Sequence, residues 1–444
     1  ISVVSHFSMA RPCVSNRLSI SVLLRFFTSA LGNSASVILS RLQEDFPEVS
    51  VTGIQSFISL QQLTIMVFTL LSGVLTAFFS KKILLVMGLL FVAAFGTLPV
   101  ILNDYYCILL TRLGFGAGLG LVTPLCLALI SENFLGEERI ALSGIQFASY
   151  NIGQAFTSVS AGKLVEVNWR YVCMLCLLAL AVLFCVLYCL PGKGLRENRV
   201  SSSSWEENLK KREEENAGTI QLNLPVAIVA LVTVAYNTPF VALYSYLSLM
   251  LSQESIGSSK IMGNGLGFLS VAGMITGILF GRIFHKIRYA SGVAAMAVVC
   301  IGYIVLSKTT SPWGIYLALF IMGAGNAVVM SFFHYHVILF APPRATAFCT
   351  AFSNVLNSLG SFLVPYLFGT YLSAIHSIHY RDVFIFAACV MAALTMLLVC
   401  YACWGRRIRV LANREEAASA GCSIAPDDSL LPGDAESDGA AGPD

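Results

Sequence analysis

Charged side chains are scarce in this sequence. Aspartate, glutamate, lysine and arginine together make up 11% of the 444 residues, whereas a soluble domain carries about 25%. So few charges cannot cover the surface of a soluble protein of this length, and the sequence has no basic stripe that predicts binding to nucleic acid. Hydrophobic residues reach 57% of the chain. They fall in windows of about 20 residues, the length that crosses a lipid bilayer, so the chain is expected to lie in a membrane.

Signatures of catalysis and of cofactor binding are also missing. There is no Walker sequence, and the glycine-rich stretch from Gly114 to Gly120 lies inside an apolar window with no preceding strand, which favours close helix packing over a nucleotide loop. The Cys-x-x-Cys pairs at Cys173/Cys176 and Cys400/Cys403 lie in apolar windows, where cysteine usually acts as a small apolar residue. We therefore expect no enzymatic activity, no cofactor and no metal site.

What the sequence does contain is a series of long apolar windows, which predict an all-α membrane protein with twelve transmembrane helices. The predicted spans are 18–40, 54–79, 83–102, 105–130, 139–164, 171–190, 224–250, 261–284, 289–307, 312–339, 345–372 and 382–404.

The single long polar break between spans divides them into two groups of six. This break, residues 191–223, is predicted to be a cytoplasmic linker between an N-terminal bundle (1–190) and a C-terminal bundle (224–404). Residues 405–444 are predicted to be a disordered acidic tail. Most of the 27 lysines and arginines fall on one side if both termini are cytoplasmic, in agreement with the positive-inside rule. The expected location is the plasma (inner) membrane.

Four of the spans carry polar residues at helical spacing, which indicates faces turned towards a neighbouring helix or an aqueous cavity. Each position could also be a simple packing residue. The candidate substrate-binding residues on these faces are Asn33, Tyr150, Asn151, Gln154, Tyr236, Asn237, Asn354 and Asn357; Asn326, in the span 312–339 and eight residues before His334, is a further candidate.

Two arginines, Arg25 and Arg112, lie within the spans, and an ionised residue at membrane depth is a candidate functional site. None of the 24 acidic residues lies in the middle of a span. This distribution argues against a carboxylate proton relay and favours an anionic or neutral substrate. His334, near the end of a span, is a candidate proton carrier because its unperturbed pKa is about 6.5, although a simple interfacial role is open as well.

The two groups of spans resemble each other in sequence, which indicates a duplicated bundle. Transporters commonly bind substrate where such repeats meet, near the bilayer midplane. The matching positions are Asn33 with Asn237, Gly73 with Gly277, Gly116 with Gly323, Gly153 with Gly360, and residues 168–171 with 379–382.

The segment from Gly73 to Lys82 resembles the loop motif Gly-x-Leu-Ala-Asp-Arg-x-Gly-Arg-Lys of the major facilitator superfamily. It keeps Gly73, Lys81 and Lys82, but Ala77 replaces the aspartate; the segment from Gly277 to Lys286 is a degenerate counterpart. Arg112 followed by Gly116 looks like the fourth-helix pattern of the drug/proton antiporter branch. The resemblance covers about residues 18–404. It implies a cavity lined by helices 1, 4, 7 and 10, and gating loops that contain Gly73, Lys81, Lys82, Gly277, Arg282 and Lys286.

These observations together predict a secondary transporter for a small organic solute, working by alternating access. Its expected partners are the small-molecule substrate, the lipid bilayer and a candidate coupling proton, and the protein is expected to be a monomer. Two alternatives are a multidrug/proton antiporter that exports lipophilic compounds and a membrane sensor or scaffold that transports nothing.

Overall fold

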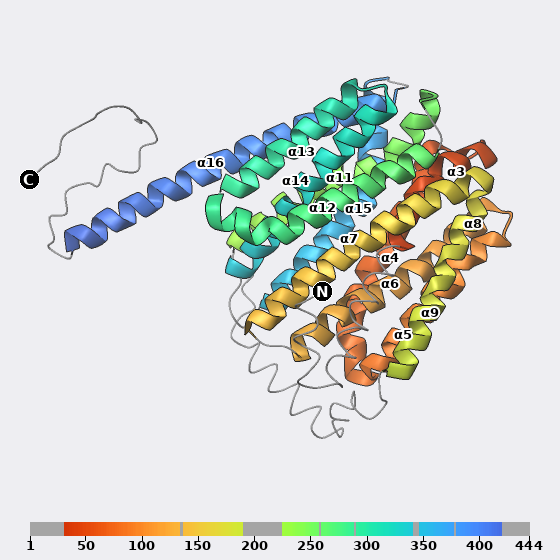
Figure 1. Cartoon of the computed structure of the whole chain (residues 1–444), viewed down its shortest axis with the longest axis horizontal. Coiled ribbons are helices and arrows are strands. Elements are labelled where there is room, and N and C mark those ends of the chain that lie inside the picture. The colour runs from red at the N-terminus through yellow and green to blue at the C-terminus, as the bar shows by residue number, and fades with distance from the viewer. Residues whose placement is uncertain are drawn as a thin grey trace, which may run out of the picture. The chain divides into compact units, whose positions relative to one another are not determined.

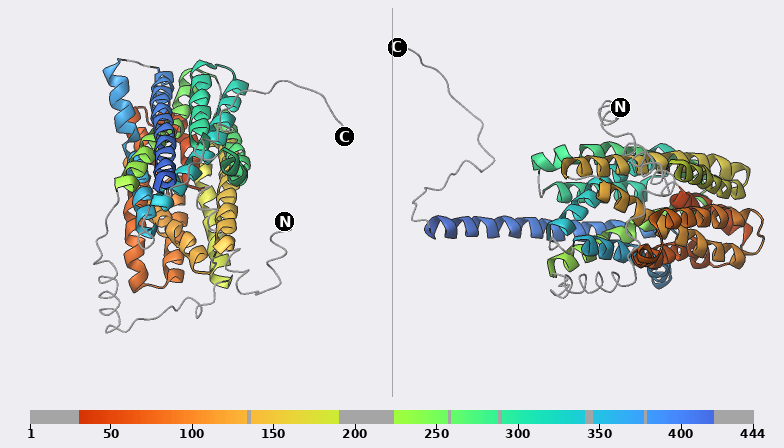
Figure 2. Two further views of the ribbon diagram at one scale, coloured as in Figure 1. Left: turned by 90° about the vertical axis from the view of Figure 1, so that its left-hand side faces the viewer. Right: turned by 90° about the horizontal axis from the view of Figure 1, so that it is seen from below.

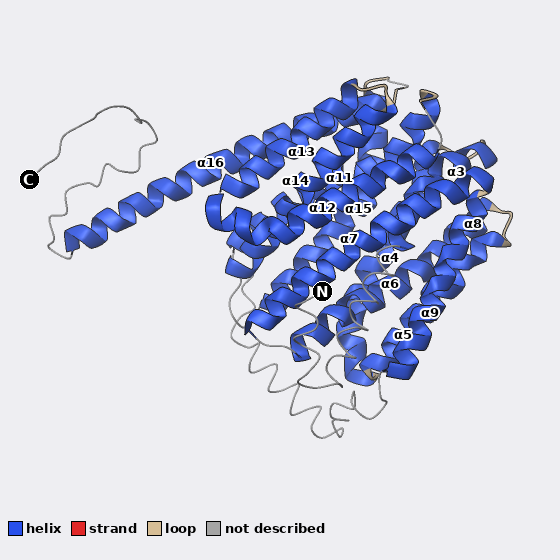
Figure 3. Cartoon of the chain, in the orientation of Figure 1, coloured by secondary structure: helices blue, strands red, loops and turns tan. Residues whose placement is uncertain are grey.

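The computed structural model describes residues 31–133, 136–189, 224–256, 259–287, 290–340, 346–376 and 379–419. The predicted linker and the first part of the first predicted span, with Arg25, lie outside these residues. The chain divides into two compact units, Ile1–Met396 and Leu397–Asp444. All regular secondary structure in the described residues is helical (Figure 3). A bilayer-spanning helix satisfies its backbone hydrogen bonds within itself, so the predicted all-α membrane fold is confirmed.

The helices of the first unit run alongside one another (Figures 1 and 2). Their bounds are η1 Ser34–Ile38, α3 Leu39–Asp45, α4 Val51–Phe78, α5 Lys81–Thr97, η2 Leu98–Val100, α6 Tyr105–Asn133, α7 Gly136–Val167, α8 Trp169–Met174, η3 Leu175–Leu177, α9 Leu178–Cys189, α11 Leu224–Gln253, α12 Ser259–Ile287, α13 Ala290–Lys308, α14 Pro312–Phe340 and α15 Thr346–Ala374. The last helix, α16 Arg381–Ser419, begins in the first unit and ends in the second.

Ten of the described helices are long and apolar enough to cross a membrane. They correspond to ten of the predicted spans. The other two predicted spans are 18–40, which is described only from residue 31, and 139–164, which lies within α7. Side chains at the loops help to set where helices begin: Ser50 accepts a hydrogen bond from the Gly53 amide before α4, and Ser80 accepts one from the Ile83 amide before α5. Such N-caps satisfy amides that have no partner in the helix itself.

The prediction for the segment after residue 404 is wrong in its first part. Helix α16 does not end there but continues to Ser419. The segment from Ala412 to Ala418 is rich in alanine, arginine and glutamate, which are good helix formers, so local propensity extends the helix beyond the apolar window.

The glycines of α6 allow close packing on two different neighbours. A Cβ atom added to Gly118 would lie 2.6 Å from the Gly88 carbonyl oxygen of α5, and one added to Gly120 would lie 2.8 Å from the Ile65 carbonyl oxygen of α4. Glycine therefore lets these backbones approach more closely than any other residue would. This geometry agrees with the packing interpretation of the stretch from Gly114 to Gly120.

The C-terminal helices repeat this arrangement. Gly323 of α14 packs on the backbone of Leu269 in α12, and a Cβ atom on Gly325 would lie 2.7 Å from the Ala295 carbonyl oxygen of α13. Gly116 occupies the corresponding place in α6, where it packs on the Gln61 carbonyl oxygen of α4. The same alternation of glycine contacts in both sets of helices is expected of a duplicated bundle.

Candidate functional site

One polar contact joins the N-terminal and C-terminal sets of helices in their middle part. The Nε2 atom of Gln154 in α7 donates a hydrogen bond to the Tyr244 hydroxyl of α11 over 3.0 Å. Nearby in the N-terminal set, Asn33 Nδ2 lies 3.5 Å from the Tyr150 hydroxyl. Gln154 is buried, whereas Asn33, Tyr150 and Tyr244 are partly exposed. These amide and phenol groups can donate and accept hydrogen bonds and carry no charge at neutral pH.

A second polar group lies within the C-terminal set. The Tyr236 hydroxyl donates to Oδ1 of Asn326 over 2.9 Å. Asn237 Nδ2 donates to the Ser361 hydroxyl over 3.1 Å and to the Asn357 carbonyl oxygen over 3.4 Å. The side-chain Oδ1 atom of Asn357 has no hydrogen-bond partner. Helices α11, α14 and α15 thus each contribute polar side chains to this group, and the Asn357 Oδ1 atom is left without a partner.

We call the partly exposed members of these two groups the polar ring. None of its side chains is charged, and both sets of helices contribute. The ring consists of Asn33, Tyr150, Tyr244, Asn237, Asn326 and Asn357.

Arg112 takes a different position from the polar ring. Its side chain is 3% exposed, its guanidinium carbon lies 3.7 Å from the centre of the Phe57 ring in α4, and its Nε atom has no hydrogen-bond partner. The Phe115 ring lies 5.3 Å away and the Cys173 thiol is also adjacent. A cation over an aromatic face is stabilised by the ring quadrupole. In this conformation the guanidinium is therefore held by an apolar pocket within the N-terminal helices.

The remaining predicted substrate-binding residues divide between buried and exposed positions. Asn151 is buried and faces α12, where its Oδ1 atom would lie 3.1 Å from a Cβ atom on Gly273. Asn354 and His334 are exposed. The Nδ1 atom of His334 is 2.8 Å from the carbonyl oxygen of Met330 in its own helix. The structure therefore does not bring Asn354 or His334 into the polar ring.

Of the predicted gating residues, Lys81 and Lys82 begin α5, whereas Gly73 lies within α4, Gly277 lies within α12, and Arg282 and Lys286 lie in the last two turns of α12. Lys82 donates from Nζ to the Leu187 carbonyl oxygen over 3.4 Å. A Cβ atom on Gly73 would meet no atom within 4 Å, so this glycine is not required by packing here. Arg282 and Lys286 are exposed, and Gly277 and Lys81 are partly exposed.

The helices meet tightly at one end, which we call the closed end: the region of Ser40, Gly162, Ser248 and Gly263. The Ser248 hydroxyl donates to the Ser40 hydroxyl over 2.9 Å. A Cβ atom on Gly263 would lie 2.7 Å from the Gly162 Cα atom. A cavity of about 70 Å³ lies beside Ser40 and Ser248, which is room for a few water molecules rather than for an organic solute.

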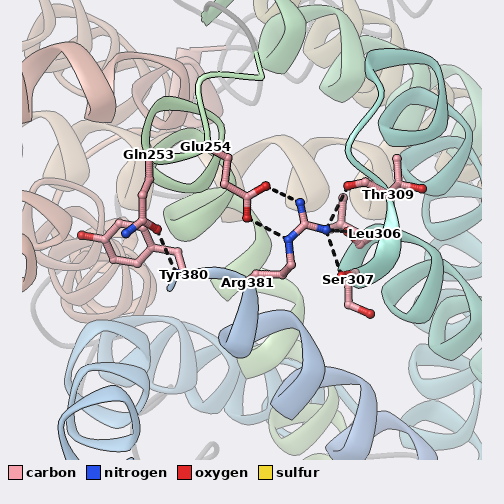
Figure 4. A network of polar contacts seen from close by, with 7 residues as sticks. All are labelled: Gln253, Glu254, Leu306, Ser307, Thr309, Tyr380 and Arg381. Carbon is pink, nitrogen blue, oxygen red and sulfur yellow. Dashed lines mark hydrogen bonds and ion pairs between the residues drawn. The ribbon is translucent and has the colours of Figure 1, made fainter. Parts of the chain in front are cut away.

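The closed end also contains two arginine caps that sequence reasoning missed. Arg381, at the start of α16, donates from one nitrogen to the carbonyl oxygens of Ser307 and Thr309 at 2.9 Å, and its Nε donates to Glu254 at 2.7 Å (Figure 4). Arg170, at the start of α8, donates to the carbonyl oxygens of Val100 and Leu102 at 2.9 and 2.8 Å.

The two caps occupy equivalent positions in the repeat. Val100 and Leu102 follow α5 as Ser307 and Thr309 end α13, with the same spacing of two residues. The similarity of residues 168–171 to 379–382 was the signal that could have revealed these caps. Next to the Arg381 cap, burial raises the pKa of the Tyr380 phenol.

Comparison with known proteins agrees with this architecture. The profile of the Major Facilitator Superfamily matches residues 18–365. A search of curated protein sequences found no match. The matched region includes the polar ring and the helices up to the middle of α15, and it ends before α16. The chain therefore belongs to the major facilitator superfamily, and it is a multi-pass membrane transporter of that fold.

Proposed function

We propose that this transporter moves a small polar organic solute across the plasma membrane by alternating access, with residues 1–190 rocking against 224–404. The observation that carries the proposal is the hydrogen bond between Gln154 and Tyr244. It joins the two sets of helices beside the partly exposed polar ring, where a bound solute would contact both. Binding at the meeting place of two repeats is common in secondary transporters.

The chemistry of the polar ring favours an uncharged solute that donates and accepts hydrogen bonds. Amides and phenols match hydroxyl and amide groups, and a site of this kind rejects analogues that leave its polar atoms unpaired. A cationic solute would find no carboxylate partner in the ring. An anionic solute is the second candidate, and it would require the Arg112 guanidinium to leave Phe57 in another conformation.

We also propose an orientation, supported by the placement of basic residues. Lys81, Lys82, Arg282 and Lys286 lie at helix ends opposite the closed end, and basic residues concentrate on the cytoplasmic side of membrane proteins. Both termini are then cytoplasmic, and the closed end faces outwards. The direction of net transport depends on the solute gradient and on any coupling ion, for which a proton is our candidate.

The test is solute counterflow in vesicles that contain the purified full-length chain. Matched small solutes that differ only in charge (a neutral polyol or amide, the related carboxylate and the related amine) are compared. We expect exchange of the neutral solute, a smaller signal for the carboxylate and none for the amine. Exchange of the amine alone would contradict the proposed substrate class, and a protein that exchanges no solute in a broad panel would favour the sensor or scaffold alternative.

A matched pair of variants links the flux to the polar ring. Tyr244→Phe removes the hydroxyl that accepts from Gln154. Thr370→Val removes an exposed hydroxyl of α15 that bonds only to its own helix, at 2.9 Å from the Tyr366 carbonyl oxygen. We expect the first variant to weaken solute exchange about fivefold to tenfold, the effect of one lost hydrogen bond, and the second to leave it unchanged.

A further inference from the structure

Gln55 is completely buried where the N-terminal helices pack on the C-terminal helices. It belongs to the first turns of α4, and its side chain is 0% exposed. One turn earlier on the same helix, the Thr52 hydroxyl would lie 3.2 Å from a Cβ atom on Gly369 of α15. The Tyr246 phenol of α11 lies beside the Gln55 amide. The surroundings of Gln55 therefore include α11 of the opposite set of helices.

The Gln55 amide makes no hydrogen bond of normal geometry there. Neither its Nε2 nor its Oε1 atom meets hydrogen-bond geometry, and its polar neighbour, the Tyr246 phenol, interacts with it only outside that geometry. The Gln61 amide, on the same helix, has its contact within one set of helices: its Nε2 atom lies 3.4 Å from the Gly32 carbonyl oxygen of the N-terminal set, while its Oε1 atom has no hydrogen-bond partner. A buried amide without a partner loses its bonds to water and gains little in return, so it raises the free energy of the conformation that buries it.

Two buried serines share this property: Ser158, at the contact of α7 with α12, and Ser59, which follows Gln55 by four residues and so lies on the same face of α4. Ser158 of α7 is 0% exposed and Ser59 of α4 is 1% exposed, and neither hydroxyl has a hydrogen-bond partner. Ser158 lies at the glycine contact, where its carbonyl oxygen would be 2.5 Å from a Cβ atom on Gly263. The adjacent Thr157 hydroxyl, by contrast, bonds to the Gly153 carbonyl oxygen over 2.9 Å.

We propose that Gln55, with Ser158 and Ser59, destabilises the conformation in which the two sets of helices are in contact at the closed end. Each of these groups is dehydrated without compensation only while the two sets of helices are in contact. When the sets separate, water reaches the groups and their cost disappears. The unpaired atoms thus raise the free energy of the closed conformation relative to the open one, and they keep the barrier to reopening low.

This inference rests on the proposed rocking of the two sets of helices, and it adds what sets the balance between the two conformations. An apolar residue of similar size at position 55 has no polar atoms to leave unpaired. It should therefore stabilise the closed conformation, and the closed end should open more rarely.

The experiment measures how often the closed end opens. Ser248→Cys places a thiol in the closed contact, because Ser248 is buried against Ser40. The purified full-length chain is treated with a membrane-impermeant maleimide. Mass spectrometry of the peptide that contains position 248 then gives the labelling rate of the introduced thiol. The native Cys107, exposed at the start of α6, is the internal reference for reagent access.

In this background we compare Gln55→Met with Gln61→Met. Gln55→Met is expected to lower the relative labelling rate about tenfold, the effect of removing one buried unpaired amide, while the melting temperature stays equal or rises. Gln61→Met is the matched control, because its hydrogen bond lies within one set of helices, and its rate should remain that of the parent. Ser158→Ala is a smaller second test and should also slow labelling.

Three results would overturn the inference. The first is a Gln55→Met variant that labels as fast as the parent or faster, and the second is one with a lower melting temperature, since the amide would then be satisfied in the closed conformation. The third is equal slowing by Gln61→Met, which would indicate a general effect of α4 packing. Failure of the proposed rocking looks different: position 248 would remain unlabelled in every variant, the parent included, while Cys107 reacts.

Discussion

Gln154 and Tyr244 stand 90 positions apart in the sequence, and their side chains meet at 3.0 Å where the two sets of helices face each other. Gln154 is buried, whereas Tyr244 is partly exposed. Gln154 therefore lies in the packed interface between the two sets of helices, and Tyr244 belongs to the polar ring. A solute bound to the ring would lie next to a hydrogen bond that rocking must break.

The energetic link between these two residues can be measured directly. We expect Gln154→Ala and Tyr244→Phe each to weaken binding of the transported solute, and their effects to be less than additive, with a coupling energy of about 1 kcal/mol. Solute-dependent thermal stabilisation of the parent, the two single variants and the double variant gives this value. Strictly additive effects would mean that the two side chains contact the solute independently.

The glycine contact at the closed end should not tolerate a larger side chain. In Gly263→Val the new Cβ atom would lie 2.5 Å from the Ser158 carbonyl oxygen and 2.7 Å from the Gly162 Cα atom, so the helices must separate. We expect solute exchange to fall at least tenfold, a steric cost of the order found for overpacked sites, and labelling at position 248 to accelerate. Gly281→Val, in the same helix with nothing within 4 Å, is the control and should behave as the parent. A Gly263→Val variant with normal exchange would contradict closure by this contact.

Arg381 is predicted to be important for stability rather than for transport. It bonds to Glu254 and to the last carbonyl oxygens of α13 (Figure 4), and hydrogen bonds to charged groups contribute about 1.5–3 kcal/mol each. Arg381→Met should lower the melting temperature by several degrees and reduce the yield of folded protein.

A surface pair provides the comparison for Arg381. Arg41 pairs with Glu44 at 2.6 Å, but both side chains are more than 40% exposed, and such pairs contribute little. Arg41→Met should leave the melting temperature unchanged. Equal effects of the two substitutions on the melting temperature would show that the Arg381 cap at α13 stabilises the protein no more than an exposed ion pair does.

The contact between Arg112 and Phe57 should be visible as a coupling in stability. A buried guanidinium 3.7 Å from a ring centre is expected to gain about 0.5–2 kcal/mol from that ring. Phe57→Leu should therefore lower the melting temperature in the parent and lower it less in an Arg112→Met background. The same variants, tested with the carboxylate solute, decide the role of the arginine in binding: loss of anion exchange alone would assign Arg112 to an anionic substrate.

Much of the fold was predictable because a segment that crosses the bilayer must be apolar and must satisfy its backbone hydrogen bonds internally. The apolar windows predicted ten of the membrane-crossing helices in the described residues, with ends close to those observed, such as 105–130 for Tyr105–Asn133. The glycine spacing in that window predicted close packing, and each glycine indeed meets a neighbouring helix. The extension of α16 to Ser419 was missed because a window of apolar residues says nothing about polar residues that favour a helix.

The polar site was predictable only in part. Helical spacing identifies the polar face of a helix, but it does not identify the residues of other helices that this face contacts. Asn33, Gln154 and Asn237 lie on the predicted faces and meet partners on other helices. Arg112 was expected to face a substrate, yet it packs on Phe57, a residue of another helix that the local sequence does not reveal. The burial of Gln55 was missed for the same reason, since its polar neighbour is Tyr246 of α11.

Solute counterflow in vesicles, with the parent chain and Tyr244→Phe compared across neutral, anionic and cationic solutes, tests the central claim most directly. The account predicts exchange that is greatest for the neutral hydrogen-bonding solute and that falls about fivefold to tenfold in Tyr244→Phe, while Thr370→Val exchanges as the parent does. Preferred exchange of cations, or exchange of the neutral solute that does not change in Tyr244→Phe, would contradict it.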